Sequence, residues 1–358
     1  MDEIKHVQLS EIAELITKGT TPTTLGYEFH DQGINFLKIE CFDENGNFIR
    51  NKVAYISEEC HEKMKRSQLK KGDILFSIAG AIGRISIVSE EMLPANTNQA
   101  LAIIRIVDEE VYLPYIKLIL TSPIVKKQFE KKKQGVAQLN LSLKDINEIS
   151  IPLPCVEKQM EFAELFGKVA GIIAKRNKEA EILDSLIKAR FIELFGDPIT
   201  NPMGWEIHRF DSLCENLDSR RRPITASERE AGNYPYYGAS GIVDYVADYI
   251  FDENILLVSE DGANLLMRST PIAFSVSGKV WVNNHAHVVR FEKMSMQKYI
   301  EVFFSLIDIS DHITGSAQPK LNQAKLNAMM FPVPNDERLD AFLQFVEQTD
   351  KSKFDCFT

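Results

Sequence analysis

The chain has no paired cysteine motif and no long apolar run, and both absences narrow the class of protein. Its five cysteines are odd in number and none forms a C-x-x-C pair, so we expect neither a disulfide framework nor a zinc or other metal site. No stretch approaches the roughly 18 apolar residues that cross a bilayer, and the N-terminus lacks the apolar core of a signal peptide. We therefore expect a cytoplasmic protein without a membrane partner. The cysteines are Cys41, Cys60, Cys155, Cys214 and Cys356.

Loops that define methyl-transferring and nucleotide-binding enzymes are missing as well. An adenine methyltransferase needs a D/N-P-P-Y/F loop, and the nearest string, Asn233–Tyr236, has a single proline. There is no G-x-G-x-x-G dinucleotide loop, and Gly278-Lys279 is followed by valine rather than the Ser or Thr of a P-loop. His285 and His287 alternate on an expected strand, and we interpret them as one loop and one core histidine rather than as metal ligands. The sequence thus predicts a chain without catalysis or a cofactor of its own.

The charge balance is acidic, since 51 Asp and Glu against 41 Lys and Arg give a net charge of −10. Phosphate groups are bound mainly by Lys and Arg, so the net charge alone argues against binding of nucleic acid. The basic residues are clustered, however, and such clusters fit a solvated face as well as a DNA surface. The clusters are Lys63, Lys65, Arg66, Lys70 and Lys71; Lys126, Lys127 and Lys131–Lys133; and Arg220–Arg222.

The strongest feature of the sequence is an internal duplication. QGVAQLNLSLKDINEISIPLP at 134–154 matches TGSAQPKLNQAKLNAMMFPVP at 314–334 with a constant offset of 180, and a glycine, an Ala-Gln pair and two prolines coincide. Upstream, TNQALAIIRI at 97–106 matches VNNHAHVVRF at 282–291, with an offset that insertions have shifted. A period this long does not fit a solenoid. We therefore infer two copies of one domain, each followed by a helix.

Each copy contains both expected strands and expected helices, which predicts an α+β fold. We call each of the two duplicated domains a head. Short β-branched runs bounded by Gly, Asp and Asn predict strands, and longer amphipathic segments predict helices. The expected strands are 73–80, 85–90, 100–107, 254–260 and 286–291, and the expected helices are 113–133 and 295–307.

Between the copies lies Val156–Phe195, a stretch of forty residues without proline. Ten positions in this stretch, eight of them apolar, recur at alternating intervals of four and three residues. This spacing is the period of a coiled-coil seam. A helix of this length is roughly 60 Å long, and we expect it to act as a spacer and to dock a partner. The seam positions are Phe162, Phe166, Val169, Ile173, Arg176, Ala180, Leu183, Ile187, Arg190 and Leu194. The expected boundaries are 1–154 for the first head, 155–197 for the helix, 198–334 for the second head and 335–358 for a short C-terminal helix.

Two α+β heads, each followed by an apolar-P-x-P element and a helix, resemble the DNA specificity subunits of Type I restriction–modification systems. The resemblance covers nearly the whole chain and rests on a combination of motifs, each of which is weak alone. The motifs are ITKGTTP (16–22), KGDILFSIAGAIGR (71–84), NTNQALAIIR (96–105), FIELFGDP (191–198), YPYYGASGIVDY (234–245), ILLVSEDGANL (255–265) and VNNHAHVVR (282–290).

The resemblance implies that each head is a target recognition domain that reads one half of a bipartite double-stranded DNA sequence. It implies that the helices dock two modification subunits, which methylate adenine with S-adenosylmethionine, and that a separate restriction subunit uses ATP. One feature departs from the family pattern, because only 24 residues follow Pro334, where a second long helix is expected. The alternative is a protein-interaction scaffold with duplicated heads and an oligomerising coiled coil, which the acidic charge favours.

The candidate DNA-binding residues are polar loop residues beside the expected strands. Arg and Lys read guanine and Asn and Gln read adenine, while Lys, Arg, Ser and Thr anchor phosphates. Each candidate fits a turn-stabilising role equally well, but Gln138 and Gln318 carry more weight because both copies keep Ala-Gln there. The candidates are Lys18, Thr20, Thr21, Arg84, Asn96, Asn98, Gln99 and Gln138 in the first head, and Arg220, Arg221, Arg222, Tyr237, Ser240, Asn264, Asn283, Asn284, His285, Gln318 and Lys320 in the second.

Overall fold

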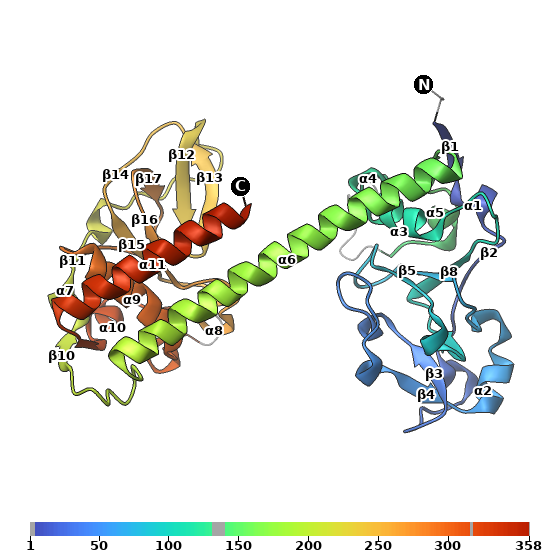
Figure 1. Ribbon diagram of the computed structural model, residues 1–358, viewed down its shortest axis with the longest axis horizontal. Coiled ribbons are helices and arrows are strands. Elements are labelled where there is room, and N and C mark those ends of the chain that lie inside the picture. The colour runs from blue at the N-terminus through green and yellow to red at the C-terminus, as the bar shows by residue number, and fades with distance from the viewer. Residues whose placement is uncertain (1–3, 131–139, 316–317, 358) are drawn as a thin grey trace. The chain divides into compact units, whose positions relative to one another are not determined.

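A computed structural model describes residues 4–130, 140–315 and 318–357 of the chain (Figure 1). The chain divides into two compact units, Met1–Ile173 and Ala174–Thr358, so the division falls inside the long helix α6 (Val156–Phe195). Each unit contains one head with small β-sheets and helices. The candidate Gln138 and the basic run Lys131–Lys133 lie outside the described residues.

The first head is built on an antiparallel sheet of order β2-β8-β5-β6. Its inner strand β5 (Ile74–Ser77) is buried along its whole length because both faces of the sheet are covered: Ile74 and Phe76 pack into one core and Leu75 into another. This explains why the strand is a continuous apolar run rather than an alternating one. A sheet of order β4-β3-β7 and the pair β1–β9 complete the head.

The remaining elements of the first head are β1 Lys5–Gln8, α1 Leu9–Ile12, β2 Leu15–Lys18, β3 Ile34–Leu37, β4 Ala54–Ile56, α2 Glu58–Lys63, β6 Ile85–Ile87, β7 Ala95–Thr97, β8 Leu101–Arg105, α3 Leu113–Thr121, α4 Pro123–Glu130, α5 Leu143–Asn147 and β9 Ser150–Leu153.

The second head repeats this plan with a sheet of order β11-β18-β15-β16, a sheet of order β13-β12-β17-β14 and the pair β10–β19. Its strand β15 (Ile255–Ser259) is buried like β5, with Leu256 and Val258 in one core and Leu257 in another. The remaining elements are β10 Glu206–Arg209, α7 Phe210–Leu213, β11 Glu215–Asn216, β12 Ala231–Gly238, β13 Gly241–Val246, β14 Phe251–Asp252, α8 Asn264–Met267, β16 Ala273–Val276, β17 Lys279–Val282, β18 Ala286–Arg290, α9 Met294–Leu306, α10 Gln323–Asn327, β19 Met330–Val333 and α11 Asp336–Phe357.

Equivalent hydrogen bonds in the two heads confirm the duplication. The phenol of Tyr115 on α3 donates to the carbonyl of Pro152 at 2.7 Å, and that of Tyr299 on α9 donates to the carbonyl of Pro332 at 2.6 Å. Both prolines lie in two-stranded antiparallel pairs, β1–β9 and β10–β19, where a residue without an N–H is tolerated. The α+β class and the two duplicated heads are therefore confirmed.

The expected strands are confirmed as β5, β6, β8, β15 and β18, but the single helix expected over 113–133 is wrong. It is two helices, α3 and α4, separated at Ser122, whose ψ of 158° is extended. Because Pro123 follows, the α conformation of Ser122 is disfavoured by contact with the proline ring. The helix expected over 295–307 is α9, one residue earlier.

The two ends of α6 pack into different cores. Near its beginning, Phe162 packs against the core of the first head. At its end, Phe191 and Phe195 are buried in the core of the second head together with Phe342 of α11. In this unit α11 runs antiparallel to the end of α6, because Arg338 donates to the carbonyl of Leu194 near one end and Lys353 pairs with Asp184 near the other.

The predicted seam positions of α6 differ in their burial. Ile187 is buried and Leu183 is half-buried, but Phe166, Val169 and Ile173 are exposed. At the end of the helix, Phe191 and Phe195 carry the packing instead of the predicted Arg190 and Leu194, which are half-buried. An α-helix of 3.6 residues per turn drifts from a strict 3.5-residue pattern, and this end enters a globular core rather than a coiled coil. In the described part of the chain, no helix is long and apolar enough to cross a membrane.

We predict that Phe191→Ala destabilises the second head by about 3–5 kcal/mol, because it removes a fully buried ring and leaves a cavity. The matched control on the same helix is Phe166→Ala, whose ring is 51% exposed and whose loss should change the free energy of unfolding by less than about 1 kcal/mol. Urea unfolding combined with hydrogen exchange of the β15 amides measures both. Equal effects of the two substitutions would contradict the packing described here.

Candidate nucleic-acid interface

Several candidate residues of the second head gather where β15 ends and β18 begins. The strands are antiparallel, with Ser259 opposite Ala286. The loop with Asn284 and His285 leads into β18, and the segment with Gln318 and Lys320 lies alongside, where Asp261 and Lys320 form an isolated bridge. The sequence therefore brings loops from distant positions to one edge of the sheet.

Ion pairs join these loops. Arg221 Nη1 donates to Glu260 Oε2 at 2.6 Å and to the carbonyl of Ala286 at 2.8 Å. Lys320 Nζ lies 3.0 Å from Glu260 Oε1, and His285 Nδ1 lies 2.9 Å from Asp261 Oδ1. The acidic residue that follows β15 thus holds two of the predicted basic residues.

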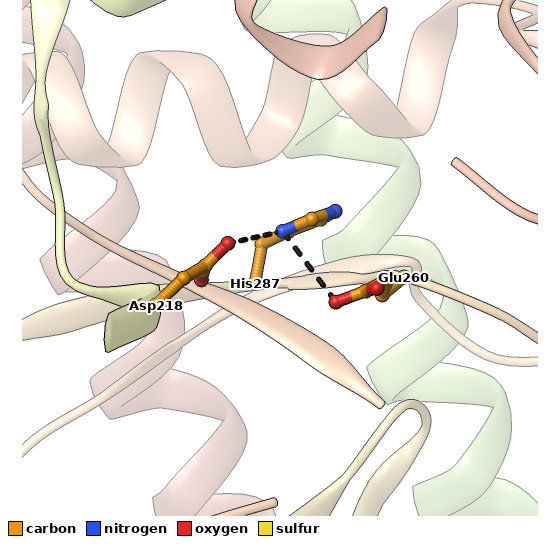
Figure 2. A group of neighbouring side chains, drawn as sticks. All are labelled: Asp218, Glu260 and His287. Carbon is orange, nitrogen blue, oxygen red and sulfur yellow. Dashed lines mark hydrogen bonds and ion pairs between the residues drawn. The ribbon is translucent and has the colours of Figure 1, made fainter. Parts of the chain in front are cut away.

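Behind this edge lies a cluster of Asp218, Glu260 and His287, whose ligating atoms are all within 4.8 Å of one another (Figure 2). The set is chemically suited to a metal, but its atoms have other partners. Arg221 pairs with both carboxylates, at 3.3 Å to Asp218 and 2.6 Å to Glu260. The cations of Arg221 and Lys320 therefore already supply the charge that a metal ion would supply.

The carboxyl groups of this cluster have lowered pKa values. Burial raises the pKa of Asp218, but its hydrogen bond to His287 and the charges of His287 and Arg221 outweigh that effect and hold it below the ordinary value. Burial also opposes ionisation of Glu260, and its hydrogen bonds from Arg221 and Lys320 again leave the pKa lowered. Both groups are ionised at neutral pH, and the stability that they contribute is lost as the pH falls through these lowered values.

Other candidates of the second head have local structural partners. Asn264 accepts from the amide of Thr270 and donates to its carbonyl, which holds a turn. Asn283 is 7% exposed, and its side chain accepts from the amide of His285. Arg220 pairs with Glu253 at 2.6 Å. Tyr237 is half-buried, whereas Ser240, Arg222 and Gln318 are exposed.

The equivalent edge of the first head also carries polar residues. Thr21 Oγ1 donates to Gln99 Oε1, which joins the loop after β2 to the loop before β8. Asn98 Oδ1 accepts from the amide of Ala100 at 3.1 Å. Gly19 lies so close to this loop that a Cβ would fall 1.9 Å from the carbonyl oxygen of Thr97, so glycine is required there. Lys18 is exposed and Thr20 is half-buried at the same edge.

Neither the Asn96 nor the Arg84 side chain is fully accessible to solvent. Asn96 is fully buried, where its amide donates to the carbonyl of Met64 and to Ser67 Oγ, both at 3.0 Å. Its Oδ1 lies against His61 Nδ1, so both polar atoms of the Asn96 side chain have partners inside the protein. Arg84 Nη1 donates to the carbonyl of Phe42 at 3.1 Å and is half-buried.

Three residues at these edges were not nominated from the sequence. Glu260 directly follows the buried strand β15, and this position is its only signal in the sequence, whereas Asp218 follows the short strand β11 and has no such signal. Arg66 belongs to a basic cluster, and its guanidinium donates to Thr17 Oγ1 beside Lys18 at 3.1 Å. The interpretation of these two histidines as one core and one loop residue agrees with the structure, in which His287 is buried and His285 is exposed.

Comparison with known proteins gives the family. The model of the Type I restriction modification DNA specificity domain matches residues 1–183 and 202–355, one match for each half of the chain. The chain belongs to this family. The two matches also agree with the internal duplication, although the second begins a few residues after α6 ends.

Individual relatives agree with the family. A Haemophilus influenzae sequence named a type I restriction enzyme specificity subunit is 33% identical over 124 residues, which are 35% of this chain and 32% of the relative. The EcoBI specificity subunit of Escherichia coli is 32% identical over 174 residues, 47% of this chain and 36% of the relative. This specificity-domain protein therefore spans about a third of the length of these two relatives. The crystal structure of a Type I S subunit from M. genitalium shares the fold, with a TM-score of 0.52 and 14% identity over all of this chain and 94% of that one.

We predict that Arg221→Ala destabilises the second head by about 2–4 kcal/mol, because it removes the one guanidinium that pairs with both of the partly buried carboxylates, Asp218 and Glu260. The matched control is Arg220→Ala, since the Arg220 side chain is 43% exposed and its pair with Glu253 should be worth about 0–1 kcal/mol. Urea unfolding at pH 7 compares the two. A larger loss in the Arg220 variant would show that the Arg221 network is not the one that holds this edge.

Proposed function

We propose that this protein is the DNA-reading subunit of a Type I restriction–modification complex in the cytoplasm and has no catalysis of its own. Each head contacts one half of a bipartite double-stranded DNA target. The observation that carries this proposal is the same polar edge in both heads, at the end of β5 beside β8 and at the end of β15 beside β18. Family membership and the duplicated fold support it.

The two edges offer the groups that read bases. In the second head, Asn284, Ser240 and Gln318 are exposed donors and acceptors, and in the first head Gln99 and Lys18 are exposed. Asn and Gln suit adenine, and Lys suits guanine or phosphate. The different residues at the two edges give each head its own half-sequence.

Ion pairs limit the affinity of the free chain for DNA. Arg221 and Lys320 are both paired with Glu260, so a phosphate must compete with a carboxylate for each of them. Together with a net charge of −10, this supports weak binding by the chain alone and tighter binding in a complex.

The middle of α6 supports partner docking. Phe166, Val169, Ile172 and Ile173 are 43–59% exposed and lie on adjacent positions of successive turns. We propose that this surface packs against modification subunits, which carry S-adenosylmethionine, and that α6 is the spacer between the two readers. The duplication supports two such subunits, and a restriction subunit that uses ATP completes the complex.

We predict that exchanging residues 198–334 for the same region of a relative changes one half of the methylated DNA sequence and leaves the other half intact. The physical reason is that each head has its own cores and its own polar edge. Mapping methylated sites in cells that carry the chimaera and the modification subunit measures this. A simultaneous change in both halves would rule out independent readers.

We also predict that Phe166→Asp with Ile173→Asp weakens binding of the modification subunit by about 100-fold, because a carboxylate is costly in an apolar contact. The control is Lys175→Asp, an exposed polar position on the same helix. Co-elution with the modification subunit and circular dichroism of α6 report binding and folding. Unchanged binding with an intact helix would place the docking surface elsewhere.

A further inference from the structure

The buried histidine of the second head has an unusual pair of hydrogen-bond partners. His287 is 1% exposed, its Nδ1 lies 2.6 Å from Asp218 Oδ2, and its Nε2 lies 2.8 Å from the carbonyl oxygen of Leu321 (Figure 2 shows the Asp218 side). Carboxylate and carbonyl oxygens only accept hydrogen bonds, so each ring nitrogen must carry a proton to bond with its partner. A ring with a proton on each nitrogen satisfies both contacts at once.

The charged groups around this ring come from several elements. Asp218 belongs to the turn after β11, and Glu260, which follows β15, has an oxygen 3.7 Å from Nδ1. Arg221 pairs with both carboxylates and Lys320 pairs with Glu260. Two carboxylates thus face Arg221, Lys320 and the ring of His287, and each carboxylate lies near more than one of these groups.

The carbonyl that His287 binds lies in the segment Gln318–Leu321, the second copy of the Ala-Gln motif. The amide of Leu321 donates to the carbonyl of Glu260 at 2.8 Å, and the amide of Gly262 donates to the carbonyl of Pro319 at 3.0 Å. Burial alternates along this segment: Gln318 and Lys320 are exposed, and Pro319 and Leu321 are buried. The segment thus presents two polar side chains from a backbone that the strand edge and His287 hold from two sides.

Among the described residues of the first head, the positions equivalent to His287 and Glu260 carry no ionisable side chain. On β18, His287 lies opposite Val258 of β15, and on β8 the equivalent residue, Ala102, lies opposite Phe76 of β5. Leu141 donates to the carbonyl of Ile78 as Leu321 does to that of Glu260, so Ile78 replaces the carboxylate. The described residues of the first head therefore place apolar side chains where the second head places His287 and Glu260.

We propose that His287 is a positioning residue for DNA reading by the second head alone. As an imidazolium between Asp218 and the Leu321 carbonyl, it fixes the Gln318–Leu321 segment, so that Gln318 and Lys320 are presented to the second half of the DNA target. This inference rests on the proposed function for its DNA readout. The tether itself is a property of the free chain and can be measured without DNA.

The first arm of the test uses the full chain labelled with ¹⁵N-histidine at neutral pH. The ring signals missing from His287→Ala assign His287, and we expect both of its nitrogens to be protonated. A neutral ring with one bare nitrogen would overturn the proposal. In the same variant, exchange of the Leu321 amide should accelerate by about tenfold to a hundredfold relative to the β15 amides.

The control is Val288→Ala, the next residue on β18, which is fully buried in the core on the opposite face of the sheet. It should lower the stability of the head without selectively exposing the Leu321 amide. If both variants accelerate exchange at Leu321 and at β15 alike, His287 has only a packing role and the proposal fails.

The second arm maps methylated sites with the modification subunits present. We expect His287→Ala to relax the half-sequence read by the second head and to leave the other half unchanged, while Val288→Ala relaxes neither. Unchanged specificity in the His287 variant would overturn the positioning role. If the wild-type complex binds no DNA, the proposed function fails, and the ring protonation and amide exchange still decide whether His287 holds the segment.

Discussion

Phe191 and Phe195 lie on the last turns of α6, where their rings pack against Tyr299 of α9 and Phe342 of α11. Buried aromatic rings contribute large apolar areas and an added preference for edge and offset contacts. The phenol of Tyr299 also donates to the carbonyl of Pro332, so the same core fixes the pair β10–β19. Because β15 and β18 contribute side chains to this core, the position of the polar edge in the second head depends on it.

The polar edge combines a rigid apolar support with paired charges. Glu260 orients the cations of Arg221 and Lys320, and its two oxygens offset part of the hydration that these cations lose. An acidic protein can thereby hold basic groups in defined positions, as the proposed reading of DNA needs. The ion pairs fix the positions of the basic side chains but weaken their attraction for a phosphate. This is consistent with the proposal that the chain works inside a larger complex.

The sequence was sufficient for the duplication, for the bounds of α6 and for five largely buried strands, β5, β6, β8, β15 and β18, because these depend on local periodicity and on internal similarity. The break at Ser122 could be predicted from the sequence, because a residue that precedes a proline disfavours the α conformation. The buried position of Asn96 was not, since its partners Met64 and Ser67 lie about thirty residues away and meet it only in the fold. For the same reason the pairing of Arg221 with Glu260 could not be predicted, so basic residues were nominated without their counter-ions.

We propose DNA binding by both heads through cations that ion pairs hold in position. It is tested most directly by the salt dependence of DNA affinity, measured with the chain bound to its modification subunits. Each neutralised phosphate should add about −0.9 to the slope of log affinity against log salt, so several contacts predict a steep linear fall between about 50 and 200 mM salt. Affinity that is independent of salt, or an absence of DNA binding by the assembled complex, would contradict the account and favour a protein-interaction scaffold.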